Sequence, residues 1–469
     1  MLSVSGRLSS KAGVVVLVAA LAAPSGAQAA DPPLLAYNAS ITQTSISGIS
    51  SGAFMAVQFG TAWSSIVKGV GAIAGGPFGC SGGSGSAAQS TCMLGMPPPK
   101  VQDMIKLTDA WSRSGAIDDT AGIAAQKIYL FHGYNDKVVA GPVSDALQAF
   151  YAHYLGSNNG NLFYQTAIGA GHSQVTLAYG APCNENGGKY INKCTYDQAG
   201  IILQHIYGAL EPRNDGAPAG KLLPFNQAEF TAPDPPNADS MDDEGFVYVP
   251  DACAAKEPCR LHVALHGCKQ SVGDIGDAFV RHAGYNEWAD TNHIIVLYPQ
   301  THVLTLTTLG ITNPESCWDW WGYLDEDPTV TPTYLLKSGK QIRTIKAMAD
   351  RVTSGVTTAS ASLASQSAEP EAMHAVDRSD TAIDVVWSSV TGVAGYDLYR
   401  AGSGDADFRQ IATVSGLSYG DSGLKPATQY RYEVRVAAPG AAGSFSPVAS
   451  ATTLQKPAPC DDPGSCPVH

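Results

Sequence analysis

The chain has 469 residues, of which 44% are hydrophobic and 15% are charged, and its formal net charge is −13. This length exceeds that of one ordinary domain, so we expect two or three globular units. The acidic balance argues against a nucleic-acid-binding surface, which needs a basic field. It suits an exported, soluble protein that acts on a neutral substrate.

Residues 1–30 have the pattern of a secretory signal peptide. Two basic residues precede an apolar run over residues 12–23, and an A-x-A cleavage site ends at Ala29. The run is too short to span a bilayer, and no later segment is long enough to do so. The pattern predicts cleavage near Ala29 or Ala30 and secretion from the cell, with the periplasm as the alternative destination.

Ten cysteines follow this segment, and in an oxidising compartment we expect them to form disulfides. Spacing suggests four local pairs and leaves a fifth, more distant one, although spacing alone leaves the connectivity open: Cys80/Cys92, Cys183/Cys194, Cys253/Cys259, Cys460/Cys466 and Cys268/Cys317. Zinc is the competing interpretation, but no paired C-x-x-C or His-Cys grouping supports it. The cysteine pattern therefore favours disulfides over a zinc site.

Residues 31–352 are expected to form one α/β catalytic domain. Strand-like runs alternate with helical ones, which is typical of a parallel sheet: ASITQTSIS, VKGVGAIAGG, KIYLFHG, NLFYQTAIGAG, EGFVYVP, RLHVALHG and HIIVLYPQ. The Pro-, Asn- and Asp-rich stretch 211–243 interrupts the pattern. The run GDAFVRHAGYNEWADT predicts one helix, and TPTYLLKSGKQIRTIKAMADRV predicts a long final helix.

The remainder of the chain predicts a linker, a β-domain and a tail. Residues 353–372 are rich in Ser, Ala and Thr and have no periodicity, as in a linker. Residues 373–455 alternate at period two between turns, which predicts an all-β sandwich. Residues 456–469 form a short tail that carries the last two cysteines.

The pattern G-x-S-x-G occurs three times, centred on Ser50, Ser81 and Ser418. A nucleophile elbow needs a strand that enters a sharp turn and a helix that follows it, so that the serine hydroxyl is lifted above the sheet edge. Only Ser50 has this context on both sides. Ser81 lies in a loop of small residues and Ser418 lies between two strands of the β-domain, so both are interpreted as turns.

A nucleophilic serine needs a base and an acid that orients the base. Asp136 and His172 each follow a predicted strand, and with Ser50 they have the chain order Ser, Asp, His of α/β-hydrolases. The rival residues lack this context, and both histidines among them are interpreted as structural: His132, His205, Asp145 and Asp197. The sequence therefore predicts a Ser50–His172–Asp136 triad.

The oxyanion hole needs two backbone N–H donors. One should come from Ser51, after the nucleophile, and the other from a loop after a strand that ends in His-Gly. That strand lies downstream, in RLHVALHGC, so the second donor is Cys268 and the two halves of the domain are in inverted order. We interpret this order as a circular permutation of the α/β-hydrolase sheet. The simpler alternative is a buried strand followed by a disulfide cysteine.

Several separate motifs within residues 38–350 resemble the polyhydroxybutyrate depolymerase and esterase families: GISSGAF, HGYNDKVV, GAGHS, VPDACAAKEPCRLHVALHGCKQS, VLYPQT and NPESCWDWWGY. The inverted order is similar to that of the single-domain, circularly permuted poly(3-hydroxybutyrate) depolymerases. The resemblance implies a polyester or oligomer substrate, cleaved through an acyl-enzyme to 3-hydroxybutyrate units. It also implies that Cys268 acts through its main chain, so that its sulfur can form a disulfide. No metal or cofactor is implied by the resemblance.

The tryptophan-rich segment has two interpretations. Its aromatic residues can seal a core, or they can line a cleft that grips the methyl-bearing ester units. Within the family resemblance we expect Trp320 or Trp321 to contact substrate.

The C-terminal sandwich resembles a fibronectin type III domain, of the kind that serves as a spacer in polymer-degrading enzymes. Only a short tail follows it here, where many depolymerases have a polymer-binding domain. We expect a monomer. The alternative functions are a feruloyl- or acetyl-xylan-type carboxylesterase and a non-catalytic protein that binds a polymer surface.

Overall fold

The computed structural model describes residues 31–232, 238–306, 311–330, 332–355, 370, 373–377, 379–387, 390, 395–405, 407–414, 416–437 and 445–456. The predicted signal peptide, most of the predicted linker and the tail with Cys460 and Cys466 lie outside these residues. The chain divides into two compact units, Met1–Val356 and Thr357–His469.

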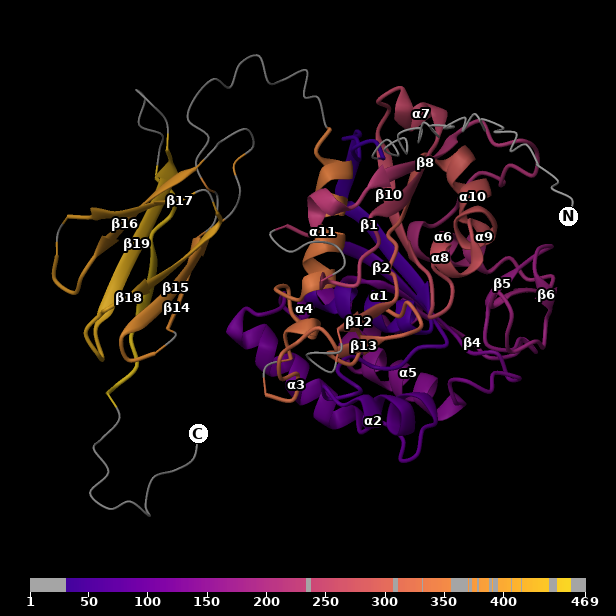
Figure 1. Ribbon diagram of the computed structural model, residues 1–469, viewed down its shortest axis with the longest axis horizontal. Coiled ribbons are helices and arrows are strands. Elements are labelled where there is room, and N and C mark those ends of the chain that lie inside the picture. The colour runs from indigo at the N-terminus through magenta and orange to yellow at the C-terminus, as the bar shows by residue number, and fades with distance from the viewer. Residues whose placement is uncertain are drawn as a thin grey trace, which may run out of the picture. The chain divides into compact units, whose positions relative to one another are not determined.

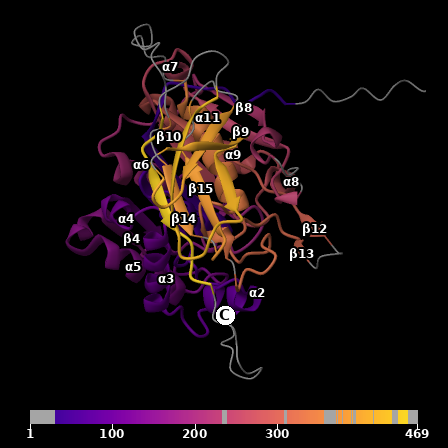
Figure 2. The same cartoon turned by 90° about the vertical axis from the view of Figure 1, so that its left-hand side faces the viewer.

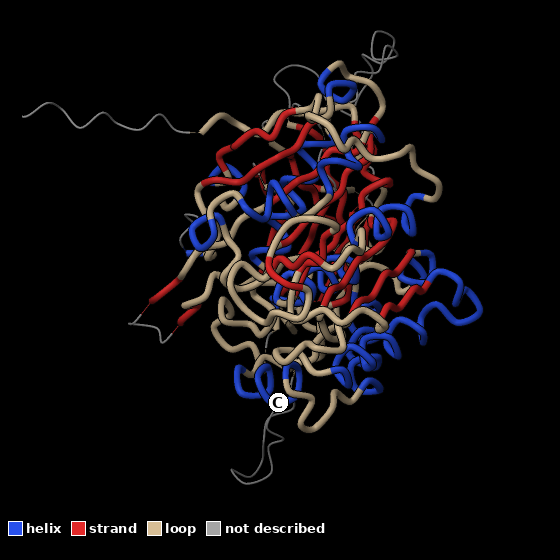
Figure 3. The backbone as a smooth tube through the Cα atoms, turned by 90° about the vertical axis from the view of Figure 1, so that its right-hand side faces the viewer, coloured by secondary structure: helices blue, strands red, loops and turns tan. Residues whose placement is uncertain are grey.

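The first unit is built around an eight-stranded sheet with the order β4-β3-β2-β1-β10-β11-β9-β8. Figure 1 labels β1, β2, β4, β8 and β10 of this sheet, and Figure 3 shows strands in red among the blue helices. Neighbouring strands from β4 to β11 are parallel, and β9 and β8 continue the sheet in antiparallel pairing. The bounds are β1 Ala39–Ile49, β2 Val67–Ile73, β3 Lys127–Phe131, β4 Leu162–Gln165, β8 Lys221–Asn226, β9 Glu244–Val249, β10 Cys259–Leu265 and β11 Ile294–Tyr298.

The two halves of this sheet come from separate parts of the chain. Residues 39–165 supply β1 to β4, and residues 221–298 supply β8 to β11. The halves meet at the parallel pair β1 and β10, in a register that places Gly48 opposite Leu265. The half that carries Ser50 therefore comes first in the chain, and β10, the strand that leads to the HGC segment, lies directly beside β1. The predicted circularly permuted α/β-hydrolase fold is confirmed.

Helices cover both faces of the sheet, with α1, α3, α5 and α11 on one face and α6, α9 and α10 on the other (Figure 1). Alternate residues of β11 enter the two cores, Ile295 and Leu297 one and Val296 and Tyr298 the other. A strand buried on both faces reads as a continuous apolar run, which is why this segment was recognisable.

The helices of the first unit are α1 Ser51–Ala62, α2 Gly85–Ala87, α3 Val101–Ser114, α4 Ala121–Ala125, α5 Gly141–Leu155, α6 Gln198–Tyr207, α7 Asp251–Ala254, α8 Val272–Ile275, α9 Ala278–His282, α10 Tyr285–Asn292 and α11 Lys340–Thr353. Shorter turns of π- or 3₁₀-helix and small sheets complete it: η1 Ala88–Met93, η2 Gly156–Asn161, η3 Ala228–Phe230, η5 Thr333–Leu335, β5 Gln174–Thr176, β6 Ala181–Pro182, β7 Ile191–Lys193, β12 Leu304–Leu306 and β13 Ile311–Asn313.

Three segments differ from the sequence-based expectation. The interrupting stretch contains β8, which ends the row of strands and tolerates Pro224 because edge strands can lack a ladder donor. The helix predicted over GDAFVRHAGYNEWADT is two helices, separated at Gly284, whose φ is 94°. The long final helix begins only at Lys340, after a separate 3₁₀ turn.

Four disulfides are present among the described residues, and they match the four pairings that the spacing suggested there: Cys80–Cys92, Cys183–Cys194, Cys253–Cys259 and Cys268–Cys317. Three of them close short loops, and the fourth joins residues that are 49 positions apart.

The second unit is a sandwich of two antiparallel sheets, β14-β15-β18 and β17-β16-β19-β20. The strands are β14 Met373–Asp377, β15 Ala382–Trp387, β16 Tyr396–Ala401, β17 Arg409–Val414, β18 Ser418–Ser422, β19 Gln429–Val436 and β20 Ala449–Thr452. Figure 2 shows β14 and β15 side by side. The Tyr430 hydroxyl accepts the Lys425 N–H (3.0 Å), which is the tyrosine corner of such sandwiches. The expected fibronectin type III-like fold is confirmed, although Ser418 begins a strand and does not lie between two.

Candidate active site

Ser50 lies on the turn between β1 and α1, at φ 55° and ψ −123°. A positive φ is unusual for serine, and such strained conformations cost about 1–3 kcal/mol and persist where the surroundings enforce them. The Ser50 N–H donates to the carbonyl oxygen of Ile73 in β2 (2.9 Å), and the Ser50 carbonyl accepts the Phe54 N–H (3.0 Å). The turn is thus anchored to the sheet on one side and to the helix on the other, as a nucleophile elbow requires.

The two glycines of the motif are required by close backbone contacts. A Cβ on Gly48 would overlap the carbonyl oxygen of Gly52. A Cβ on Gly52 would overlap the carbonyl oxygen of His266 and lie 2.7 Å from that of Leu265. Gly52 therefore allows the elbow to lie directly against the end of β10, where the second oxyanion donor is expected.

His172 and Asp136 form a buried pair. The Nδ1 of His172 lies 2.8 Å from Oδ2 of Asp136, and their side chains are 5% and 1% exposed. Burial pushes the pKa of Asp136 upward, but the hydrogen bond and charge of His172, together with the N–H groups of Val138 (2.8 Å) and Val139 (3.0 Å), outweigh it and hold the pKa below its usual value. Asp136 is therefore a carboxylate that orients His172 with Nδ1 donating, and Nε2 remains available to take a proton.

The rival residues have other partners. His132 bonds to the Val139 carbonyl, His205 to that of Asn161, Asp145 to the Tyr164 hydroxyl, Asp197 to the Gly200 N–H and Ser81 to the Trp320 carbonyl.

One cavity of about 80 Å³ brings Ser50, His172 and Cys268 together. Its lining consists of Ile49, Ser50, Met93, Val138, His172, Tyr190, Gly267, Cys268, Lys269, Gln270 and Glu315. A larger cavity of about 460 Å³, beside Arg213 and Glu287, contains none of the predicted catalytic residues. Because chemistry needs the nucleophile and the base at one place, we assign the smaller cavity as the candidate active site.

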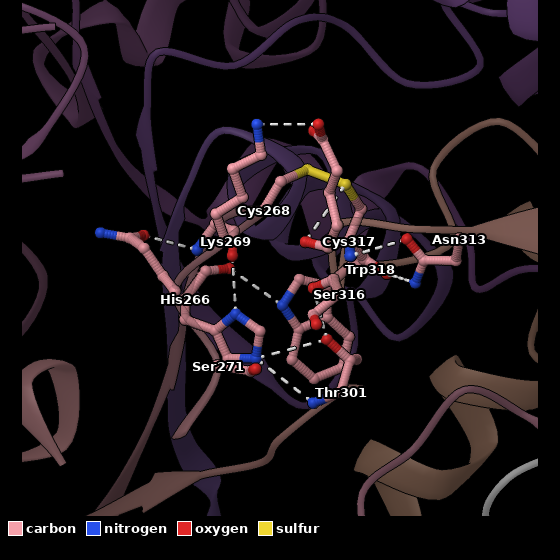
Figure 4. The surroundings of a disulfide bond; sticks show 12 residues. His266, Cys268, Lys269, Ser271, Thr301, Asn313, Ser316, Cys317 and Trp318 are labelled. Atoms are coloured by element: carbon pink, nitrogen blue, oxygen red, sulfur yellow. Dashed lines mark hydrogen bonds and ion pairs between the residues drawn. A yellow bond between two sulfur atoms is a disulfide. The ribbon is translucent and has the colours of Figure 1, made fainter. Parts of the chain in front are cut away.

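The loop after β10 is fastened to the tryptophan-rich segment (Figure 4). Cys268 is bonded to Cys317, the Lys269 N–H donates to the Glu315 carbonyl (2.7 Å), and the Lys269 ammonium lies 2.8 Å from the Glu315 carboxylate. Among the described residues, no hydrogen-bond acceptor is recorded for the Ser51 N–H or for the Cys268 N–H. Both groups are thus free to stabilise an oxyanion, Ser51 as the first residue of a helix.

The two tryptophans predicted to contact substrate do not line this cavity. Trp320 is 7% exposed and stacks on Phe54, with ring centroids 4.2 Å apart. Trp321 is half-buried and packs edge-on against Trp320 at 5.4 Å. The substrate-binding role of Trp320 and Trp321 stays a prediction.

Several lining residues were not identified from the sequence. Lys269 and Gln270 directly follow the HGC segment, so their position next to the expected oxyanion donor was a usable signal. Glu315 lies two residues before Cys317, the suggested partner of Cys268, which was also a usable signal. Met93, at the end of η1, and Tyr190 come from distant segments, and nothing in their local sequence points to the cavity.

Within the described part of the chain, no three or more His, Cys, Asp or Glu side chains are grouped as for a metal ion. The helices described there are too short or too polar to cross a membrane.

The serine elbow at the centre of this sheet and the Asp136–His172 pair define the protein as a hydrolase of the α/β-hydrolase class. Comparison with known proteins narrows the class. The chain is 41% identical over 416 residues to a poly(3-hydroxybutyrate) depolymerase of Delftia acidovorans. The aligned region covers 87% of this chain and 79% of the relative. It is 37% identical over 318 residues to a polyhydroxybutyrate depolymerase of Talaromyces funiculosus, covering 66% of this chain and 90% of that one. The chain belongs to the poly(3-hydroxybutyrate) depolymerase family.

Solved structures agree with this assignment. The crystal structure of the PHB depolymerase from Penicillium funiculosum matches with a TM-score of 0.61 and 34% identity, over 69% of this chain and 99% of that chain. A PHB depolymerase with a serine-to-alanine change, complexed with an R3HB trimer, matches equally well. No family model matches the chain.

Proposed function

We propose that the protein hydrolyses the ester bonds of poly(3-hydroxybutyrate), or of related short-chain polyhydroxyalkanoates, to 3-hydroxybutyrate monomers and oligomers. The observation that carries the proposal is the single cavity shared by Ser50, Cys268 and the Asp136-paired His172. Two relatives named as depolymerases of this polymer, and a solved relative complexed with an R3HB trimer, support the choice of substrate.

Acylation starts when the Oγ of Ser50 attacks the ester carbonyl while the Nε2 of His172 takes the hydroxyl proton. The negative charge that develops on the carbonyl oxygen is stabilised by the N–H groups of Ser51 and Cys268. The tetrahedral intermediate then collapses. His172 gives its proton to the alcohol oxygen of the departing unit, and a 3-hydroxyacyl group remains esterified to Ser50.

Deacylation repeats these roles with water as the nucleophile. His172 takes a proton from the water, which attacks the acyl carbonyl, and then returns the proton to Ser50 as the acid product leaves. Throughout the cycle the Asp136 carboxylate holds the Nδ1–H of His172 and stabilises the imidazolium that forms in each half.

The cavity has a mixed lining. Met93, Val138 and Tyr190 provide apolar and aromatic surface, whereas Lys269 and Glu315 are charged. Apolar surface combined with a few polar groups is typical of pockets that bind and orient a small substrate.

We also propose that the protein is exported and acts as a monomer outside the cell. The signal-like pattern of residues 1–30 and the four disulfides support export.

The proposal is tested by the clearing of an amorphous poly(3-hydroxybutyrate) suspension, with identification of the soluble products. Wild type should clear the polymer and release 3-hydroxybutyrate units, whereas Ser50→Ala should not. Ser418→Ala is the matched control, because Ser418 lies in the same sequence pattern in the second unit, and it should behave as wild type.

Two results would contradict the proposal. If wild type leaves the polymer intact but cleaves soluble or feruloyl esters, the enzyme is a carboxylesterase of another specificity. If Ser50→Ala still clears the polymer, Ser50 is not the nucleophile.

A further inference from the structure

We propose that Gln270 is a positioning residue that presets the oxyanion hole of the Ser50 site. The inference rests on the proposed ester hydrolysis and assigns a role within that chemistry. Gln270 follows the HGC segment, lines the cavity and is 1% exposed.

The Gln270 side chain joins two walls of the cavity. Its Oε1 accepts the Gly267 N–H (2.7 Å), and its Nε2 donates to the carbonyl oxygens of Lys189 and Tyr190 (2.9 Å each). The Tyr190 ring stands edge-on to the His172 ring, with centroids 6.0 Å apart. One buried amide thus connects the loop of the oxyanion donor to the segment beside the catalytic histidine.

The peptide between His266 and Gly267, the first of that loop, is held at both of its polar groups. The His266 carbonyl accepts the indole N–H of Trp318 (2.9 Å), as Figure 4 shows, and the N–H of the same peptide, on Gly267, is bound by Gln270. Because a peptide unit is planar and trans, binding its C=O and its N–H fixes the orientation of the whole plane.

The next peptide, between Gly267 and Cys268, carries the oxyanion donor and is held by a hydrogen bond to its carbonyl group. The Gly267 carbonyl accepts the Nδ1–H of His266 (2.7 Å), so the N–H of Cys268, on the opposite side of the same plane, has a defined direction. The tautomer follows from the other ring nitrogen, since Nε2 accepts the Thr301 N–H (3.2 Å). Burial lowers the pKa of His266 to about 4, which keeps the ring neutral.

Together these contacts leave the Cys268 N–H as the group of this loop that is free to bind substrate. A donor fixed before the reaction needs no reorganisation when negative charge develops, and removal of one such donor costs roughly 10²- to 10³-fold in kcat. Loss of Gln270 leaves the donor present but releases the Gly267 peptide. We therefore expect a smaller loss, of about 10- to 100-fold in kcat.

The test compares Gln270→Leu with Gln126→Leu. Gln126 is likewise 1% exposed, and its Nε2 donates to the carbonyl oxygen of Gly60 (2.7 Å). It does not line the cavity, and its partner takes no part in the contacts that hold the loop after β10. Each variant leaves a buried backbone group without its hydrogen bond, so both should lose stability, and only Gln270→Leu should lose turnover.

The measurements are kcat and KM for p-nitrophenyl butyrate, inhibition by a butylboronic acid, and thermal unfolding. A boronic acid forms a tetrahedral anion on the serine, so its affinity reports on the oxyanion hole. Gln270→Leu should lower kcat about 10- to 100-fold, leave KM nearly unchanged and weaken boronate inhibition by a similar factor. Gln126→Leu should keep the wild-type kcat and boronate affinity.

Gln270→Glu provides a rescue and a second variant if the leucine variant does not fold. A neutral carboxyl group can accept from Gly267 and donate to one of the two carbonyls, whereas a carboxylate cannot donate. Its kcat relative to wild type should therefore rise as the pH falls from about 8 to about 5.5.

The inference is overturned if Gln270→Leu keeps wild-type kcat and boronate affinity, or if both leucine variants lose kcat in parallel with stability. The inference is also overturned if the kcat of Gln270→Glu equals that of wild type at every pH. Failure of the proposed function is a separate result, because it is measured on the polymer suspension, which the wild-type protein would then leave intact.

Discussion

The chemistry of the site depends on single side chains whose charge and direction are set by their neighbours. Asp136 accepts from the ring of His172 and from two backbone N–H groups, which keeps it ionised although its side chain is only 1% exposed. A carboxylate that accepts three hydrogen bonds is held in one direction, and its bond to Nδ1 orients the imidazole of His172.

Replacement of Asp136 by asparagine should remove most of the activity and preserve the fold. The amide has the shape of the carboxylate but no charge to stabilise the imidazolium, so kcat for a soluble butyrate ester should fall by about 10³- to 10⁴-fold at neutral pH. Asp145→Asn is the control, since Asp145 is exposed and bonds only to Tyr164. Retention of more than about a tenth of the activity by Asp136→Asn would exclude the assigned role.

Asp319 predicts a pH dependence of stability. Burial, and then the charge of Asp325, raise the pKa of Asp319 from 3.8 to about 7 although backbone N–H groups of Gly322 and Tyr323 bond to it. Between these two values the folded state binds more protons than the unfolded state, so stability falls as the pH rises from about 4 to about 7.

Asp319→Asn should remove this contribution, because its amide oxygen still accepts both N–H groups and does not ionise. We expect the melting temperature to fall further for the wild type than for the variant between about pH 5 and about pH 8. Calorimetry at both pH values checks this, and equal losses in the two proteins would show that Asp319 is not protonated in the folded state.

At the scale of elements, the site exists because the β1–α1 turn lies against the end of β10. The two elements come from opposite halves of the sheet, and the contact depends on the missing side chain of Gly52. The loop after β10 is then fastened from outside by the Cys268–Cys317 disulfide.

Gly52→Ala should therefore be strongly destabilising. Its Cβ would meet two backbone carbonyls, which cannot rotate away, and overpacking of this kind costs about 1–3 kcal/mol or more. Gly160→Ala is the control, because a Cβ there meets nothing within 4 Å. Urea unfolding midpoints measure both effects, and a wild-type midpoint for Gly52→Ala would show that the two elements are further apart than described.

At the scale of the whole molecule, the residues assigned to the site all belong to the unit Met1–Val356. The second unit has its own core, formed around Trp387, Leu398 and Tyr432. We therefore expect the bond-breaking step not to require the second unit.

A fragment of residues 31–356 should hydrolyse soluble butyrate esters with the kcat/KM of the full chain, because each unit has an independent hydrophobic core. Clearing of the polymer suspension by the fragment and by the full chain, measured in parallel, reports what the second unit adds. A folded fragment that is inactive on soluble esters would contradict the division of labour.

Local patterns in the sequence were sufficient for the elbow, the order of the triad and the inverted halves of the sheet. A strand, a tight turn and a helix are encoded by neighbouring residues, so Ser50 could be separated from Ser81 and Ser418. The apolar runs of the buried strands and the spacing of the cysteines were equally local signals.

The lining of the cavity was decided by the tertiary structure. Tyr190 and Gln270 meet only because segments 80 residues apart are brought to one edge of the sheet, and no local periodicity encodes that contact. The same holds for Trp320, whose aromatic character suits both a cleft and a core, and whose stacking on Phe54 depends on how two distant elements pack. The sequence by itself determined which residues are predicted to carry the chemistry, because their backbone context is local. The fold decided which side chains surround and orient them, because those contacts form only when distant segments of the chain pack against the folded sheet.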